Sequence, residues 1–78
     1  METKEIKSED LRNLILKQPV YLFNDYEEAV IRTEPGEEIT FYIKFHGGTE
    51  FEAKDGSELI TDTLLQPLII SEEDYKKY

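Results

Sequence analysis

The clearest pattern in the chain is an alternation of apolar and polar residues over 38–46, EITFYIKFH. The odd-numbered positions from 39 to 45 are isoleucine or phenylalanine, and polar or amphipathic residues stand between them. This period of two is typical of a β-strand with one buried face. Strand-like composition also occurs at 20–23, 28–33 and 49–54, with turn-forming residues between these stretches. The pattern therefore predicts an antiparallel meander of three to four strands.

Helical features lie outside the meander. Residues 9–17 carry an apolar stripe at helical spacing, and Ser8 precedes them as a candidate N-cap. A second short helix is expected after Ser57, which can cap it, and before Pro67.

The last ten residues add two further elements. Residues 68–70, LII, read either as a last strand or as a buried extended stretch. Ser71 followed by Asp74 resembles a capping box that opens a final helical turn.

Together these elements predict a small α+β fold, a single domain over residues 1–78 whose first seven residues we expect to be flexible. The N-terminal helix and a short C-terminal helix would pack on one face of the sheet. The predicted core consists of apolar residues on that face: Leu11, Leu14, Ile15, Leu22, Ile31, Ile39, Phe41, Ile43, Phe45, Phe51, Leu64 and Leu68.

The parity of the flanking strands predicts the hairpin at FHGGTE, residues 45–50. A three-residue loop, 46–48, pairs Ile43 with Phe51 and keeps both faces consistent, whereas a two-residue loop sets apolar residues opposite acids. Gly48 would supply the left-handed conformation that such a loop requires.

The same test at EPGE, residues 34–37, favours a type II turn with Ile31 opposite Phe41. Lys44 would then lie between Glu28 and Glu50, one cation between acids of both neighbouring strands.

The amino-acid composition limits which cellular compartment and which stabilising cross-links we expect for this fold. The 78 residues include no cysteine, which excludes disulfides and thiolate-bound metal and fits a reducing compartment. The longest apolar runs are far shorter than the roughly 20 residues that span a bilayer. We therefore expect a cytoplasmic protein that does not enter a membrane.

Charge is the most informative feature of the composition. Eighteen acidic and nine basic residues give a net charge of −9, and the excess is concentrated in residues 24–38 (net −5) and 50–62 (net −4). Such a charge repels nucleic-acid backbones and anionic lipids, so direct binding to either is not expected. A basic protein surface is the partner that this charge would attract.

Candidate catalytic residues are few. His46 is the only histidine, and the predicted hairpin places it in a solvent-exposed turn without a nucleophile beside it. The glycine pair lies between two strands, unlike a phosphate-binding loop, and DGSE at 55–58 lacks the alternating acids of a calcium loop. We expect no catalytic site, metal or cofactor.

Carboxylates are the candidate binding groups. The meander would gather Asp25, Glu27, Glu28 and Glu50 at one end and Glu34, Glu37, Glu38, Asp55 and Glu58 at the other. The outward face of the sheet would carry Tyr42 beside Glu52, with Val30 next to Arg32, and an exposed aromatic among charges can anchor an interface. Tyr26, Tyr75 and Tyr78 are further tyrosines that we expect to be exposed.

The simplest explanation of the acidic residues is that they only keep the protein soluble. Three functions are also consistent with these features. The first is a non-enzymatic protein-binding module that docks its carboxylates on a basic protein surface. By analogy of size and charge, it could mimic nucleic acid, as small inhibitors encoded by phages and mobile elements do. The alternative is an assembly module that pairs through a sheet edge or its tyrosines as a homo-oligomer. An enzyme dependent on His46 ranks last.

Overall fold

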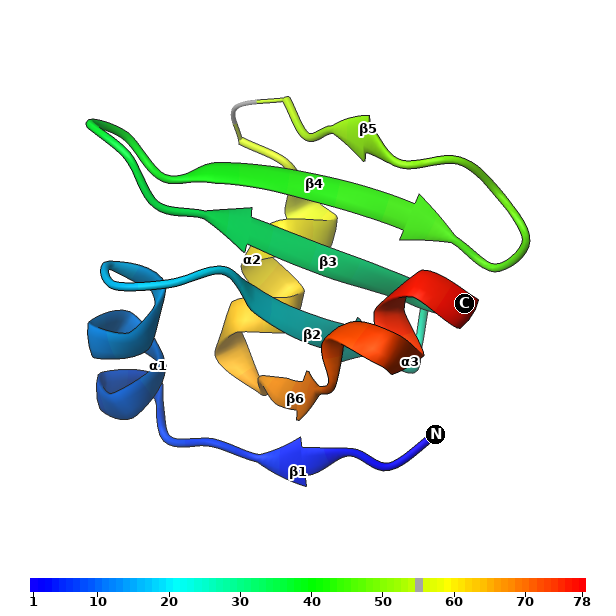
Figure 1. The fold of residues 1–78 in the computed structure, drawn as a ribbon, viewed down its shortest axis with the longest axis horizontal. Helices are drawn as coiled ribbons and strands as arrows, with labels where there is room; N and C mark the ends of the chain where they lie inside the picture. The colour runs from blue at the N-terminus through cyan, green and yellow to red at the C-terminus, as the bar shows by residue number, and fades with distance from the viewer. Residues whose placement is uncertain (55) are drawn as a thin grey trace.

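The computed structural model describes residues 1–54 and 56–78. These residues form one antiparallel sheet and three helices. The strands are β1 (Lys4–Glu5), β2 (Val20–Asn24), β3 (Ala29–Glu34), β4 (Thr40–Phe45), β5 (Phe51–Glu52) and β6 (Leu68–Ile70). The helices are α1 (Ser8–Ile15), α2 (Glu58–Leu65) and α3 (Glu72–Lys77). The predicted mixed fold with an antiparallel sheet is confirmed (Figure 1).

The sheet has six strands in the order β1-β6-β2-β3-β4-β5, more than the three to four predicted. β6 lies between β1 and β2 and pairs antiparallel with both, so the LII stretch is a strand. β1 was not predicted because its two residues are polar and exposed and carry no apolar pattern. It continues the sheet beyond β6 at the edge opposite β5.

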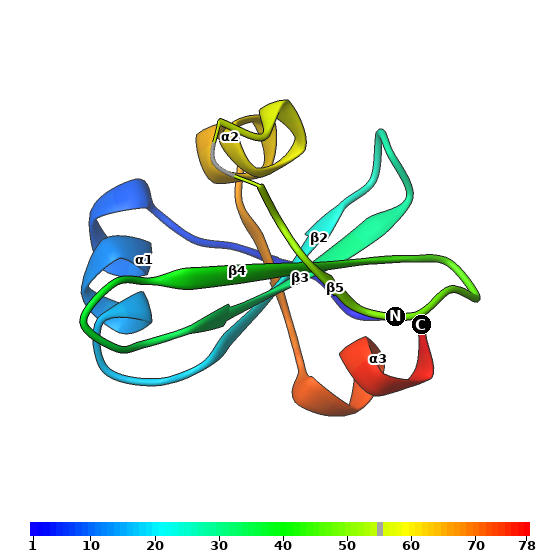
Figure 2. The same ribbon diagram turned by 90° about the horizontal axis from the view of Figure 1, so that it is seen from above.

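Helices cover both faces of the sheet, which contradicts the prediction that they pack on one face. Figure 2 shows α2 on one side of the sheet and α3 on the other. The core below α1 and α2 is built around Leu11, Leu22, Ile31, Ile43 and Ile60. A second, smaller core below α3 contains Val30, Ile70 and Tyr75, with partly buried Tyr21, Phe23 and Tyr78 around it.

The second core explains two wrong predictions of exposure. Val30 is 0% exposed and Tyr75 is 6% exposed, although both were expected on the outward surface. Conversely, Phe45 and Phe51 were expected in the core and are 42% and 46% exposed. Their rings stack at 6.0 Å near the β5 edge, on the face that α1 and α2 only partly cover.

The register of β3 and β4 differs by two residues from the prediction. Ile31 pairs with Ile43, not with Phe41, and Lys44 lies opposite Val30, not opposite Glu28. The connection between the strands takes five residues, 35–39, and Gly36 lacks the positive φ of a type II turn. Because the shift is even, every side chain still points to the predicted face.

The register of β4 and β5 is confirmed, since Ile43 pairs with Phe51 and Tyr42 with Glu52. The turn differs in one respect. The Gly48 N–H donates to the Phe45 carbonyl at 2.8 Å, and Gly47, at φ +73°, is the left-handed residue. A side chain at Gly48 would meet the Phe45 carbonyl oxygen at 3.2 Å, so both glycines serve the turn.

Two of the three predicted helix caps are confirmed. Ser57 accepts a hydrogen bond from the Ile60 N–H at 3.4 Å, and Ser71 accepts one from the Asp74 N–H at 3.1 Å. Ser8 is instead the first residue of α1, whose N-cap is Lys7 without a side-chain hydrogen bond. Among the described residues, no helix combines the length and the apolar character that crossing a membrane requires.

Candidate functional site

Most side-chain carboxylates of the described residues have no cation beside them. Of the eighteen acidic residues, Asp55 lies outside the described residues, which leaves seventeen. Five of these lie within 4 Å of a lysine or arginine nitrogen: Glu2, Glu34, Glu50, Glu72 and Glu73. The other twelve form no such pair, and all of them except the half-buried Asp74 are exposed.

The turn between β2 and β3 carries three of these free acids, Asp25, Glu27 and Glu28, as predicted from the meander. The buried Asn24 orders this turn, because its Oδ1 accepts a hydrogen bond from the Glu27 N–H at 2.9 Å. Glu28 has a positive φ of 51°, an uncommon conformation for a residue with a side chain. The ordered backbone of the turn therefore determines the positions from which these three acidic side chains project.

The five-residue connection between β3 and β4 lies at the opposite end of these strands and carries Glu37 and Glu38, both exposed and unpaired (Figure 1). Glu52 on β5 and Glu58 at the start of α2 are also exposed. The predicted division of acids between two ends thus holds for the turn residues. It does not hold for Glu34 and Glu50, which one arginine joins.

Arg32 binds both of those carboxylates. Its Nε and Nη2 donate to the two oxygens of Glu50 at 2.7 and 3.0 Å, and its Nη1 donates to Glu34. Its guanidinium carbon lies 4.1 Å from the centroid of the Tyr42 ring, a cation–π contact. The Tyr75 hydroxyl donates to the same Glu50 carboxylate. Glu34, Glu50 and Tyr42 therefore already hold an internal cation.

These contacts shift the acidity of the groups involved. Hydrogen bonds from Arg32 are the main reason that the pKa of Glu50 lies below its ordinary value, against a smaller opposing effect of burial. Burial is the main cause that raises the pKa of Tyr75, and the neighbouring Glu50 raises it further. The tyrosine thus stays a neutral donor and Glu50 a charged acceptor at neutral pH.

Lys44 contacts the C-terminal end of α3, and His46 contacts Tyr78, the residue that follows this helix. The Lys44 ammonium donates to the carbonyls of Tyr75 and Lys76 at 3.4 and 3.2 Å, at the negative end of α3. The predicted position of Lys44 between Glu28 and Glu50 is wrong on the Glu28 side, because the shifted register places Val30 opposite Lys44. Lys44 still lies near enough to Glu50 to lower its pKa, although the ion pair of Glu50 within 4 Å is with Arg32. The exposed His46 ring packs edge-on against Tyr78 at 4.8 Å.

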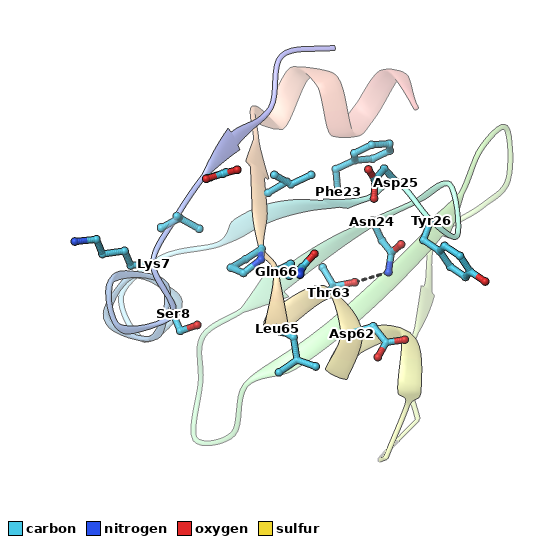
Figure 3. Close-up of a pocket in the computed structure, with 14 residues that line it drawn as sticks. Lys7, Ser8, Phe23, Asn24, Asp25, Tyr26, Asp62, Thr63, Leu65 and Gln66 are labelled. Atoms are coloured by element: carbon cyan, nitrogen blue, oxygen red, sulfur yellow. Dashed lines mark hydrogen bonds between the residues drawn. The ribbon is translucent and has the colours of Figure 1, made fainter.

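A groove of about 880 Å³ lies between the β2–β3 turn, the C-terminal part of α2 and the segment that leads into α1 (Figure 3). Its apolar lining includes Ile6, Phe23, Leu65, Pro67 and Leu68. Its charged lining consists of Glu5, Asp25, Asp62 and Lys7, which leaves a net charge of −2.

Tyr26 lines the groove at the turn and is 89% exposed. Figure 3 shows Lys7 and Ser8 at the end of the groove far from Tyr26.

One buried hydrogen bond joins the end of β2 to α2, next to the two aspartates that line the groove. Asn24 Nδ2 donates to Thr63 Oγ1 at 2.9 Å, and both residues are buried (Figure 3). Asp25 follows Asn24 in the chain and Asp62 precedes Thr63. The two carboxylates are therefore attached to backbone segments that a specific contact holds together.

Asp62 was not among the predicted binding residues. Its spacing of four from Glu58 places both on one side of a helix, and this signal was present in the sequence. Asn24 and Thr63 could not have been found in this way, because their contact joins residues 39 positions apart.

Within the described residues, no group of three histidine, cysteine, aspartate or glutamate side chains is arranged to hold a metal ion. No family model, curated protein or solved structure matches this chain. Its function is therefore argued from its own surface.

Proposed function

We propose that this chain is a non-enzymatic binding module that docks its free carboxylates on a basic protein surface. The observation that carries the proposal is the set of exposed acids without an internal cation. An internal salt bridge would have to break before such an acid could bind a partner, and these acids have none to lose. Their charge would also raise the rate of encounter with a basic partner.

The placement of the acids supports a more specific form of the proposal. The acids of residues 25–28 and of residues 37–38 are fixed at opposite ends of the same strands. Separated groups of carboxylates on a rigid sheet could occupy the positions where a basic groove binds successive phosphates. The chain would then act in the cytoplasm as a nucleic-acid mimic that inhibits a basic, nucleic-acid-binding protein, as proteins encoded by phages or mobile elements do.

A non-enzymatic role also fits the surroundings of the candidate catalytic group. His46 contacts the Tyr78 ring, and the Gly47 N–H beside it donates to the Tyr78 carbonyl at 3.0 Å. These contacts connect the hairpin to the C-terminal residue and give the histidine a structural role.

Affinity capture at two salt concentrations, followed by mass spectrometry, tests the proposal. We expect basic proteins to be retained at about 50 mM salt and lost at about 500 mM, because salt screens exposed charge pairs. Nucleic acid should compete with the chain for the captured protein if the chain is a mimic. Retention of only neutral or acidic proteins, or retention that salt does not change, would overturn the proposal.

A second function, assembly into a homo-oligomer, is favoured by one observation. β5 lies at an edge of the sheet, and the exposed, stacked rings of Phe45 and Phe51 lie beside this edge. Exposed edges with apolar side chains pair readily with other strands. Tyr26 could contribute to such an interface, but Tyr75 is buried and could not.

Light scattering distinguishes the two functions. Assembly through Phe45 and Phe51 predicts an oligomer that persists at high salt and that Phe51→Ser converts to a monomer. A monomer at millimolar protein concentration would exclude this second function and leave the first.

A further inference from the structure

We propose that the groove between the β2–β3 turn and α2 binds an arginine side chain in an extended segment of the basic partner. This inference rests on the proposed function and names the site and the chemistry by which the partner would be recognised. The arginine would lie between Asp25 and Asp62, against the exposed ring of Tyr26. Its flanking residues would lie along the apolar lining that includes Leu65.

Charge complementarity selects a cationic occupant. Among the residues that the structure describes, the charged groups of the groove form no ion pair within 4 Å. Lys7 is the lining cation, and it lies at the end far from Tyr26 (Figure 3). The end formed by Asp25, Tyr26 and Asp62 is therefore negative and has no cation of its own.

The chain itself shows how these residue types hold an arginine. Arg32 is bound by two carboxylates, Glu34 and Glu50, and its guanidinium lies over the Tyr42 ring. The groove is lined by the same residue types, two carboxylates and one tyrosine, and neither carboxylate forms an ion pair within 4 Å. Arginine suits this set better than lysine, because its planar guanidinium can bind carboxylates at two points while it stacks on a ring.

The groove also has the size and order that binding requires. Its volume of about 880 Å³ lies within the range of ordinary ligand pockets. The buried hydrogen bond from Asn24 to Thr63 holds the two walls together before the ligand arrives. Such preorganisation lowers the entropy that binding would otherwise lose. The exposed Leu65, at 71%, offers apolar contact to the residues beside the arginine.

The test is an NMR titration of the full chain with N-acetyl-arginine amide, recorded on backbone amides. The uncharged analogue N-acetyl-citrulline amide, which has nearly the same shape, is the matched control ligand. We expect arginine to shift the amides of residues 24–27 and 61–66 and citrulline to shift them little.

Variants locate the site. Asp25→Asn with Asp62→Asn should weaken binding of arginine about fivefold or more, because two charge pairs are lost. Tyr26→Ala should weaken it about two- to fivefold, and Tyr26→Phe should retain it, because the ring supplies the cation–π contact. The control Glu37→Gln with Glu38→Gln removes the same charge at the other end of the sheet and should leave the affinity unchanged.

Equal shifts with arginine and citrulline would overturn the inference. It would also be overturned if the control pair weakened binding as much as the groove pair, since arginine would then sense only net charge. The spectrum of the free chain also reports self-association, and occupation of the groove by a second copy would likewise overturn it. None of these outcomes decides the proposed function, because the salt-sensitive capture of a basic protein tests it independently.

Discussion

Arg32 and Glu50 form a two-point ion pair that joins β3 to the residue before β5 on the face that α3 covers. The Tyr75 hydroxyl donates to the same carboxylate, so one side chain connects the edge of the sheet, a central strand and the C-terminal helix. Tyr75 also packs in the second core, which contains the fully buried Val30. Glu50 therefore stabilises the fold and is not free to bind a partner.

Glu50→Gln should destabilise the protein, because the amide loses the charge that Arg32 and Tyr75 both contact. We expect the free energy of unfolding in urea to fall by about 1–2 kcal/mol, since the pair is partly exposed. The matched control is Glu52→Gln, an exposed acid without a cation partner, which should change it by less than about 0.5 kcal/mol. Equal effects of the two substitutions would show that the network contributes nothing.

Acidification should remove the contribution of Glu50. Its pKa is lower in the folded chain than its ordinary value of 4.5, so the folded state binds the proton less readily than the unfolded state. The stabilisation is present above pH 4.5 and declines as the pH falls through the folded pKa. Urea titrations between pH 7 and 2 should show a steeper loss for the wild type than for Glu50→Gln. Parallel curves would contradict the assignment.

Tyr75→Phe tests how α3 is held. The ring remains in the second core, but the hydrogen bond to Glu50 is lost, which should cost about 1 kcal/mol. Amide hydrogen exchange should accelerate in α3 more than in β2 and β3, because the loss is local to the helix.

Alkaline pH gives a second readout for Tyr75. The pKa of its hydroxyl is raised in the folded state, so stability should fall as the pH rises above about 10, the ordinary pKa. Tyr75→Phe should remove part of this fall and leave the part due to Tyr21 and Tyr78, whose pKa values burial also raises. An unchanged alkaline profile would show that Tyr75 is not coupled to folding.

Val30→Ala tests the second core directly. Removal of two buried methyl groups should lower the free energy of unfolding by roughly 1–3 kcal/mol, measured by urea denaturation. If α3 did not cover this face, Val30 would be exposed and the change would stay within about 0.5 kcal/mol.

Several parts of the fold could be predicted because local pattern determines them. The alternation in β4 and the parity argument at residues 45–50 gave the correct β4–β5 register, and Ser57 and Ser71 cap their helices as expected. The strand at 68–70 was one of two alternatives, and its place between β1 and β2 could not be deduced, since pairing between distant segments leaves no local signal.

The wrong predictions that Val30 and Tyr75 are exposed share one physical origin, which is the unrecognised second layer. α3 has only six residues, and its acids and lysines suggest a solvated helix. Tyr75 nevertheless packs at 5.1 Å from the Tyr21 ring and makes the outward face of the sheet a core. For the binding residues, spacing gave the acidic turns correctly, but the contact of Glu50 with Arg32 depended on the register of β3 and β4. Glu34 lies two residues from Arg32 on the same strand, so its contact with Arg32 does not depend on that register.

The central claim is that localised free carboxylates, and not net charge, bind a basic protein. It is tested most directly by comparing the binding of a captured basic partner to two triple variants that each remove three charges. Asp25→Asn with Glu27→Gln and Glu28→Gln neutralises the β2–β3 turn, whereas Glu2→Gln with Glu9→Gln and Asp10→Asn neutralises the N-terminal region. We predict that the turn variant loses affinity about tenfold or more at 100 mM salt and the N-terminal variant does not. Equal loss in both variants, or no loss in either, would contradict the claim.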